Sequence, residues 1–294
     1  MPSSRIDPMA ARAFAVEVIE KLRQGGYEAV WAGGCVRDQL LDRVPLDYDV
    51  ATAARPDAVR NIFGRRNTIA VGAAFGVITV IGSKDTGNVE VATFRSDAEY
   101  VDGRHPVGVT FCGAQEDALR RDFTINGLFF DPTAGNVIDY VGGQQDLSEG
   151  VVRAIGNPIM RFEEDHLRIL RAIRFSANFE FPIESNTRKA IVLLARKVES
   201  VSPERLAAEL RLMFSRQGRG EALRLLVNTN LIHPLFGNRF KRSETFLFSA
   251  ADTLDAMKKP NISSAIAVLC YEKPRLAVEI SNHLRLSNHE RKLA

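Results

Sequence analysis

The spacing of apolar side chains changes along this chain and predicts two kinds of structure. Phe14, Val18 and Leu22 lie four residues apart within residues 8–24, which predicts an amphipathic helix. Further helices are expected at 36–41, 56–63 and 115–121. Short apolar runs between turn residues predict strands at 29–32, 75–81, 88–94 and 123–130. Strands that alternate with helices in this way are typical of an α/β sheet covered by a helical layer.

The second half of the chain has helical periodicity almost throughout, from about residue 158 onward. Breaks are expected near Phe181-Pro182, Ser202-Pro203, 217–220 and Lys259-Pro260. Ser202-Pro203-Glu204 predicts a helix start, because it combines a serine cap, a proline in the first turn and an acid near the positive end of the helix dipole. The pattern therefore predicts an α/β head followed by an all-helical body.

Residues 33–50, GGCVRDQLLDRVPLDYDV, contain the first candidate for chemistry. Asp47 and Asp49 flank Tyr48, and in an extended strand residues two apart project to the same face. Two carboxylates on one face suit Mg²⁺, which usually takes one or two carboxylates together with substrate phosphates. The motif suggests metal-dependent phosphoryl or nucleotidyl transfer, although an isolated Asp-x-Asp more often marks a solvated strand edge.

A glycine turn precedes these carboxylates. Gly33-Gly34, followed by Arg37 and Asp38, resembles a phosphate cradle, in which glycines let backbone N–H groups approach the anion at a helix start. The alternative is a plain turn with an Arg–Asp pair on the surface.

Two further features extend this candidate site. Glu90 lies on a predicted strand, where it is either a third carboxylate or an ion-pair partner of Arg95, and we favour the ion pair. In the run Arg120-Arg121-Asp122, two arginines and an aspartate could bind triphosphate and ribose hydroxyls, or only cap a helix.

Residues 163–175, EEDHLRILRAIRF, contain the second candidate. Its charged side chains recur every three residues and would wind along one side of a helix, while leucines and isoleucines occupy the other side. These charged residues are Asp165, Arg168, Arg171 and Arg174. An ordinary amphipathic helix with solvated ion pairs also explains the pattern.

Asp165 and Arg168 also suit the recognition of a base. Cytosine and adenine each present an exocyclic amino donor beside an unprotonated ring nitrogen, whereas uracil and guanine place a carbonyl beside a ring N–H. An aspartate can accept from the amino group while an arginine donates to the ring nitrogen. The wrong base would leave buried polar groups unpaired, so one such pair would select C and A together.

The distribution of charge separates the same two parts of the chain. Residues 1–150 hold 15 Lys and Arg against 21 Asp and Glu, whereas residues 151–294 hold 24 against 15. This split suggests an acidic half that holds metal and a basic half that meets a polyanion, although solvated arginine-rich helices explain it equally well.

The remaining composition predicts an ordinary cytoplasmic protein. Cys35, Cys112 and Cys270 are odd in number and far apart, which predicts reduced thiols, and the five histidines lack the spacing of a zinc site. Neither a signal peptide nor a membrane-spanning stretch is recognisable.

Nine motifs in order, from about residue 28 to about residue 215, resemble those of the bacterial and eukaryotic class of tRNA nucleotidyltransferases, the CCA-adding enzymes, and their poly(A) polymerase relatives. They are GGCVRD, LDYDV, VEVATFR, YVDGRHP, RRDFTINGL, VIDYVGGQQDL, RAIGNP, RFEEDHLRILRAIRF and PERLAAEL. The resemblance implies an α+β fold with a polymerase-β-like head of mixed sheet and helices at 1–150. A helical neck at 151–215 would contain the base-recognition helix, and a helical body would occupy 216–294.

The resemblance also implies roles for individual residues. Asp47 and Asp49 would be catalytic and would bind Mg²⁺. Residues of the glycine turn and the arginine run would surround the incoming nucleotide, namely Gly33, Gly34, Arg37, Arg121 and Asp122. Asp165 and Arg168 would be the protein template for C and A, with Arg171 and Arg174 lining the same pocket.

The implied activity is template-independent addition of C, C and A to the tRNA 3′ end from CTP and ATP, with Mg²⁺ and without a membrane partner. The alternatives on the same fold are CC addition, A addition or poly(A) polymerisation. A non-catalytic tRNA-binding protein is a further alternative, which the intact Asp-x-Asp counts against. The segment EYVDGRHP, residues 99–106, favours competence in A addition, since its counterpart is lacking or altered in CC-adding enzymes.

Two departures from the family pattern accompany this resemblance. Gly127 stands where the family usually has alanine. The chain also ends at Ala294, where family members commonly continue, so a tail that grips the tRNA is expected to be missing. The oligomeric state is not predicted.

Overall fold

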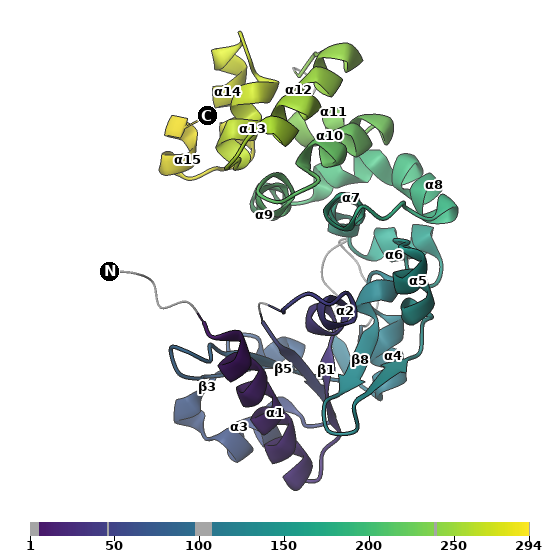
Figure 1. The fold of residues 1–294 in the computed structure, drawn as a ribbon, viewed down its shortest axis with the longest axis vertical. Coiled ribbons are helices and arrows are strands. Elements are labelled where there is room, and N and C mark those ends of the chain that lie inside the picture. The colour runs from purple at the N-terminus through teal and green to yellow at the C-terminus, as the bar shows by residue number, and fades with distance from the viewer. Residues whose placement is uncertain (1–5, 46, 98–107, 238–239, 294) are drawn as a thin grey trace. The chain divides into compact units, whose positions relative to one another are not determined.

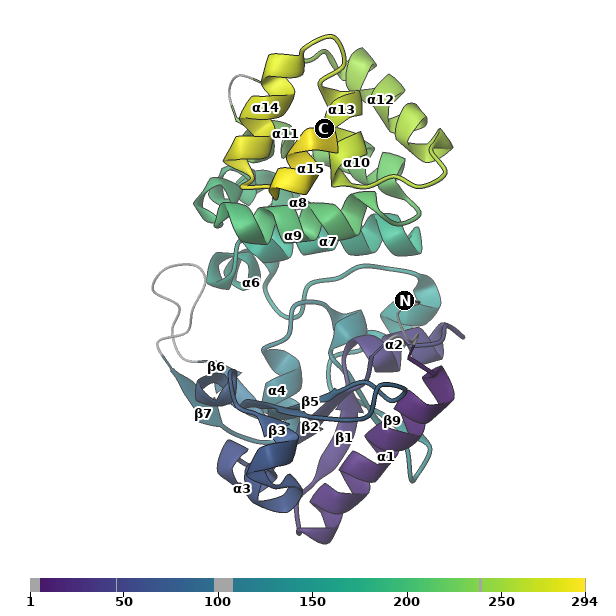
Figure 2. The same cartoon turned by 90° about the vertical axis from the view of Figure 1, so that its left-hand side faces the viewer.

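The computed structural model describes residues 6–45, 47–97, 108–237 and 240–293. They form two compact units, called here the head unit (up to residue 149) and the helical unit (from residue 150). Figures 1 and 2 show a sheet with helices in the first and a stack of helices in the second. The segment 99–106 lies outside the described residues. Across the described ranges, no helix is both long and apolar enough to cross a membrane.

A seven-stranded mixed sheet forms the centre of the head unit, in the order β3-β4-β5-β2-β1-β8-β9. Its strands are β1 (Ala29–Ala32), β2 (Asp49–Thr52), β3 (Thr68–Ile69), β4 (Val77–Val80), β5 (Val89–Thr93), β8 (Leu128–Asp131) and β9 (Asn136–Asp139). β2 and β5 run parallel, whereas the other described neighbours run antiparallel. A separate pair is formed by β6 (Arg95–Asp97) and β7 (Val109–Phe111). The predicted mixed sheet is confirmed.

Helices cover both faces of this sheet. They are α1 (Pro8–Gln24), α2 (Gly34–Leu40), α3 (Pro56–Phe63), α4 (Ala114–Leu119) and α5 (Gly143–Glu149). Val30 and Ala32 of β1 belong to the same buried cluster as Ala118 of α4. Trp31 between them lies beneath the guanidinium of Arg12 from α1, 5.2 Å from the ring centre. Because successive strand residues point to opposite faces, α1 and α4 lie on opposite sides of the sheet.

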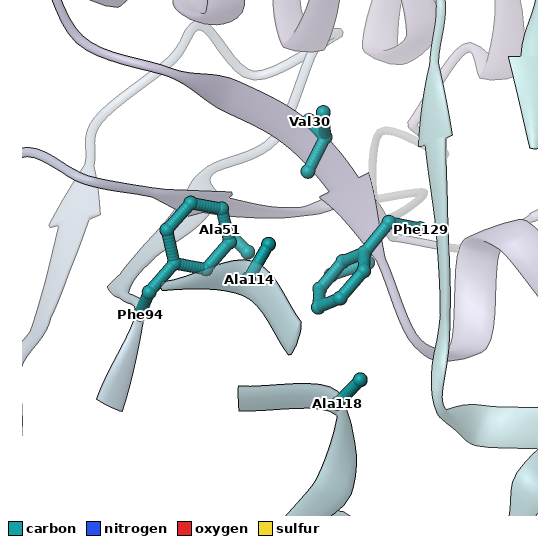
Figure 3. Close-up of a cluster of buried hydrophobic side chains, with 7 residues drawn as sticks. Val30, Ala51, Phe94, Ala114, Ala118 and Phe129 are labelled. Atoms are coloured by element: carbon teal, nitrogen blue, oxygen red, sulfur yellow. The ribbon is translucent and has the colours of Figure 1, made fainter. Parts of the chain in front are cut away.

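Small side chains let α4 approach the sheet closely. Figure 3 shows Ala114 and Ala118 of this helix directed toward Phe94 and Phe129. The two phenylalanine rings meet edge to face, with their centres 5.9 Å apart, a favourable aromatic geometry. All four side chains are buried. The helix that carries the Arg120-Arg121 run at its C-terminal end is therefore fixed against the centre of the sheet.

The helical unit packs around one buried helix, α7 (Leu167–Phe179), which contacts α9 (Pro203–Phe214) and α10 (Arg219–Asn228). The other helices are α6 (Pro158–Glu164), α8 (Ser185–Leu194), η4 (Ala195–Ser200), α11 (Ile232–Phe236), α12 (Glu244–Ala256), α13 (Ile262–Leu269), α14 (Pro274–His283) and α15 (Asn288–Leu293). An isolated parallel bridge pairs Val152 with Ile183. The predicted helical second half is confirmed. Its division into neck and body stays a prediction.

Most predicted elements occur where the sequence placed them. α1, β1 and α3 match their predicted ranges, and the four predicted helix breaks in the second half all separate observed helices. The three cysteines are free, as expected. The predicted strand 75–81 is shorter, because residues 73–75 form a 3₁₀ turn.

Two local predictions were wrong, and the predicted helix start at Ser202 is confirmed without the capping hydrogen bond. The run 123–130 is not one strand, since the 3₁₀ turn η3 (Thr124–Asn126) precedes β8. Ser202 occupies the N-cap of α9, but its side chain makes no capping hydrogen bond. Asp165 is not helical: it has extended backbone angles between α6 and α7, so the row of charges on α7 begins at Arg168.

Candidate active site

Asp49 is the first residue of β2 and Asp47 lies two residues before it; both residues are exposed, although protein atoms surround part of the Asp49 carboxylate. β2 pairs with β1 and β5, which places Asp49 directly opposite Ala32 on one side and Glu90 on the other. Tyr48 turns to the opposite face, where its ring lies 4.9 Å from that of Trp31. Paired residues in neighbouring strands share a face, so Glu90 and Asp49 project together.

The surroundings of Asp49 make its ionised form unfavourable. The pKa of Asp49 is raised to about 7, first because neighbouring protein atoms displace water, and then because of the negative charges of Asp47 and Glu90. Arg121 acts in the opposite direction and lowers this pKa. Within the described ranges, neither aspartate carboxylate forms an ion pair or hydrogen bond, so the charge of Arg121 offsets the repulsion only in part.

This arrangement suits a cation that also binds phosphate. No set of three His, Cys, Asp or Glu side chains is arranged to hold a metal ion among the described residues. Mg²⁺ needs fewer protein ligands than that, since it commonly keeps waters and substrate phosphates around one or two carboxylates. The uncompensated pair Asp47 and Asp49 fits this ion. Glu90 forms no ion pair with Arg95 in the described part of the chain, so that prediction was wrong.

The glycine turn lies against Arg121. Gly33 has a φ of +70°, a conformation that favours glycine, and a Cβ added there would lie 3.1 Å from Nη1 of Arg121. Gly34 begins α2, and in the same turn Cys35 Sγ donates to the carbonyl of Asp49 at 3.9 Å. The turn, the carboxylate strand and Arg121 are thus brought together, and any larger residue at position 33 would displace the guanidinium.

Asn126 joins the two arginines of the site. Arg37 Nη1 donates to Asn126 Oδ1 at 2.6 Å, and Arg121 Nη1 donates to the Asn126 carbonyl at 3.4 Å. Asn126 Nδ2 in turn donates to Asp122 Oδ1 at 3.1 Å. Arg37 also pairs with Asp38 at 2.7 Å, as the plain-turn alternative expected, but Arg37 is buried rather than on the surface. Asp122 is buried too and accepts from the Phe123 N–H, so it holds the turn η3 in place.

The second candidate site lies wholly in the helical unit. Asp165 accepts from Arg205 through both oxygens, at 3.1 and 2.7 Å, and from the Leu167 N–H at 3.1 Å. The Arg168 N–H donates to the Asp165 carbonyl at 3.0 Å, so the two residues bracket a single turn of the backbone. Arg168 Nη1 donates to the Arg161 carbonyl at 3.1 Å and to the Glu164 carboxylate. Both proposed base-reading side chains are therefore held by neighbours.

Glu209 of α9 holds the other two arginines of the row. Its Oε2 accepts from Arg174 Nε at 2.6 Å, and its Oε1 lies 3.8 Å from Arg171 Nη1. Arg174 and Glu209 are both buried, and the Arg174 guanidinium also lies over the Phe175 ring at 4.2 Å. This geometry gives Arg174 a structural partner, and its predicted place in a nucleotide pocket stays a prediction.

Four residues of these sites were missed from the sequence. Asn126, Asp117, Arg205 and Glu209 contact the predicted residues directly. Asn126 was visible inside the motif RRDFTINGL, and Arg205 and Glu209 inside PERLAAEL. Their spacing of four residues on α9 puts them on one face, which was the available signal.

Two family profiles match the chain. The profile described as "Poly A polymerase head domain" matches residues 29–153. The profile described as "Probable RNA and SrmB- binding site of polymerase A" matches residues 180–238. The first contains the candidate site residues of the head unit, and the second contains Arg205 and Glu209.

Curated relatives are similar over most of the chain. The CCA-adding enzyme of Oceanobacillus iheyensis is 36% identical over 283 residues, which are 94% of this chain and 67% of that enzyme. The CCA-adding enzyme of Bacillus subtilis is 38% identical over 78% of this chain and 56% of its own length. The chain thus spans between just over half and two thirds of the length of these relatives.

Solved structures have the same fold. The Bacillus stearothermophilus CCA-adding enzyme, crystallised in complex with CTP, superposes with a TM-score of 0.80 at 31% identity, covering 95% of this chain and 67% of that one. The Thermotoga maritima CCA-adding enzyme complexed with tRNA superposes with a TM-score of 0.74 at 21% identity, covering 98% and 69%. The second likeness concerns the fold alone.

Proposed function

Since the chain belongs to the family of CCA-adding enzymes, we propose that it adds C, C and A to the 3′ end of tRNA from CTP and ATP and releases pyrophosphate. The observation that supports this best is the pair of carboxylates of Asp47 and Asp49 near the start of β2. In the described ranges neither carboxylate forms a hydrogen bond or ion pair, and the positive charge of Arg121 lowers the pKa of Asp49. The proposal places the protein in the cytoplasm.

The head unit would supply binding and orientation. Asp47 and Asp49 would hold Mg²⁺, which when bound lowers the pKa of a hydroxyl group and neutralises phosphate charge. Arg37 and Arg121 would bind the triphosphate beside the glycine turn, where Gly33 leaves room for it. Because Asn126 fixes both guanidinium groups, little ordering remains to be done when the nucleotide arrives.

The helical unit would choose the base. Asp165 keeps room for a further hydrogen bond, since a carboxylate has about four acceptor sites and three N–H donors, from Arg205 and Leu167, occupy part of them. It would accept from the amino group of cytosine or adenine, while Arg168 would donate to the ring nitrogen beside it. Uracil and guanine would present a carbonyl to the carboxylate and would be rejected.

One incubation tests this proposal. The purified chain is mixed with tRNA that lacks its terminal CCA, Mg²⁺ and one or all of the four labelled nucleotides. We expect CTP alone to give two additions, CTP with ATP to give three, and UTP or GTP to give none. Long A tracts would indicate a poly(A) polymerase, two additions without a third would indicate a CC-adding enzyme, and tRNA binding without incorporation would indicate a non-catalytic protein.

A further inference from the structure

Asp117 is a buried carboxylate at the centre of α4 whose two oxygens face two arginines. Its side chain is 1% exposed. Oδ1 accepts from Arg120 Nε at 3.0 Å and Nη2 at 2.7 Å, and Oδ2 accepts from Arg121 Nε at 3.2 Å and Nη2 at 2.8 Å. Burial alone would raise the pKa of Asp117, but the two guanidinium groups outweigh burial and lower it. The carboxylate is therefore ionised, and each of its oxygens accepts hydrogen bonds from an arginine.

The backbone around Asp117 fixes its position. Oδ1 also accepts from the Arg95 N–H at 3.2 Å, at the first residue of β6. The flanking Ala114 and Ala118 pack into the apolar cluster under the sheet (Figure 3). The Asp117 carboxylate is therefore fixed by β6 through the Arg95 N–H and by the packing of α4 against the apolar cluster.

The two arginines held by Asp117 point to different places. Arg120 Nε donates to the Arg95 carbonyl at 2.8 Å, so this guanidinium ties α4 to β6. Arg121 leads instead to the proposed phosphate site: its Nη1 donates to the Asn126 carbonyl, and it lies over the Phe129 ring at 4.9 Å. The Nη1 group of Arg121 thus lies on the side of the glycine turn, 3.1 Å from where a Cβ on Gly33 would be.

From this geometry we infer that Asp117 is a positioning residue for triphosphate binding. Asp117 accepts hydrogen bonds from Nε and Nη2 of Arg121, which lie on one edge of the guanidinium. The remaining group, Nη1, is thereby directed toward the glycine turn. Without that anchor, Arg121 would keep only its 3.4 Å contact with the Asn126 carbonyl and its packing on Phe129, and the ligand would have to supply the remaining order at the cost of its affinity. The inference rests on the proposed role of Arg121 in binding the triphosphate.

A double-mutant cycle with inorganic triphosphate and Mg²⁺ tests this inference by calorimetry. Asp117→Asn keeps the volume and removes the charge, and we expect it to raise the Kd roughly tenfold. Arg121→Ala should raise the Kd at least as much, and adding Asp117→Asn to it should change nothing further. An unchanged Kd in Asp117→Asn, or a further tenfold loss in the double variant, would overturn the inference.

Controls separate positioning from simple stabilisation. Asp131→Asn removes another ion-paired carboxylate of the head unit, which contacts Arg23 at 2.9 Å, and should leave the Kd within twofold. If Asp117→Asn does not fold, Asp117→Glu replaces it in the same cycle, with an expected loss of at least threefold that disappears beside Arg121→Ala. Wild-type affinity in Asp117→Glu would then overturn the inference.

Kinetics distinguish this inference from the proposed function. Asp117→Asn should raise the KM for CTP about tenfold and change kcat by less than threefold, because it acts on binding. If the wild-type chain incorporates no nucleotide, the proposed function fails, while the cycle with inorganic triphosphate still decides the role of Asp117. Absence of triphosphate binding by the wild-type chain would overturn the inference as well.

Discussion

The two candidate sites differ in whether their charged side chains are paired with protein groups of opposite charge. In the head unit, Asp47 and Asp49 repel each other without a protein partner in the described ranges, and the pKa of Asp49 is raised to about 7. In the helical unit, Asp165 is clamped by Arg205, and Arg168 donates to Glu164. Carboxylates that bind a cation are better left without a positively charged protein partner, because the bound cation then relieves the repulsion between them. A site that reads a base must instead hold its hydrogen-bonding groups in fixed directions.

The largest expected effect tests the uncompensated side of this comparison. Asp49→Asn should lower kcat for CTP incorporation at least about 1000-fold, because it removes a metal ligand and its charge. Single-turnover incorporation into tRNA measures this. Glu90→Gln is the matched control, since it removes a neighbouring carboxylate that we do not assign to the metal, and it should keep more than about a tenth of the rate. Equal losses in both variants would make Glu90 a ligand.

The next effect concerns the compensated side. Glu209→Gln leaves Arg174 charged and buried without its carboxylate, and should lower the free energy of unfolding of the helical unit by about 3 kcal/mol. Urea denaturation followed by circular dichroism measures this. Glu204→Gln on the same helix breaks the exposed pair with Arg285 and should cost no more than about 0.5 kcal/mol. A small loss in Glu209→Gln would contradict the view that α9 holds the charges of α7.

A smaller effect sharpens the base-reading assignment. Asp165→Ala should reduce the preference for CTP over UTP, measured as the ratio of kcat/KM values, by about 100-fold. The head unit is untouched, so incorporation itself should continue. A variant that loses all incorporation while keeping its preference would show that Asp165 acts in catalysis or folding instead.

The smallest effect is a pH dependence within the helical unit. Glu184 caps α8 by accepting from the N–H groups of Asn186 and Thr187, and its pKa is lowered to about 2, because these hydrogen bonds outweigh the effect of burial. A lowered pKa stabilises the fold above the unfolded value near 4.5, and the contribution is lost as the pH falls toward 2. Glu184→Gln should therefore cost about 1 kcal/mol at pH 7 and almost nothing near pH 2. Thermal melts at both pH values check this, and a constant difference would contradict it.

The sequence predicted what depends on neighbours in the chain. Asp49 begins a strand as predicted, whereas Asp47 lies in a bend before it but still close enough to raise the pKa of Asp49. α1 and α3 follow from apolar periodicity and proline. It could not predict partners that tertiary packing brings together. Arg205 lies 40 residues from Asp165, and Glu209 lies 35 residues from Arg174.

The periodic pattern also failed to predict two local departures from regular secondary structure. The three-residue repeat from Asp165 to Arg174 looked like one continuous helix, but the chain extends at Asp165, whose side chain then accepts from the Leu167 N–H instead of lying on a helical face. The apolar run 123–130 looked like one strand, but hydrogen bonds from the Phe123 N–H and Asn126 to Asp122 form a turn there. In both places an aspartate side chain competes with regular backbone structure.

The ring pair of Trp31 and Tyr48 gives the head unit an optical property. Trp31 is the single tryptophan of the chain, fully buried, and its Nε1 has no hydrogen-bond partner among the described residues. Its neighbour Tyr48 is the residue between the two carboxylates. All tryptophan emission therefore comes from a ring that contacts Tyr48, the residue between the two proposed cation ligands in the sequence. If tryptophan is excited selectively over the tyrosines, titration of the unlabelled protein with Mg²⁺ would be recorded by Trp31, without a contribution from Tyr271 of the helical unit.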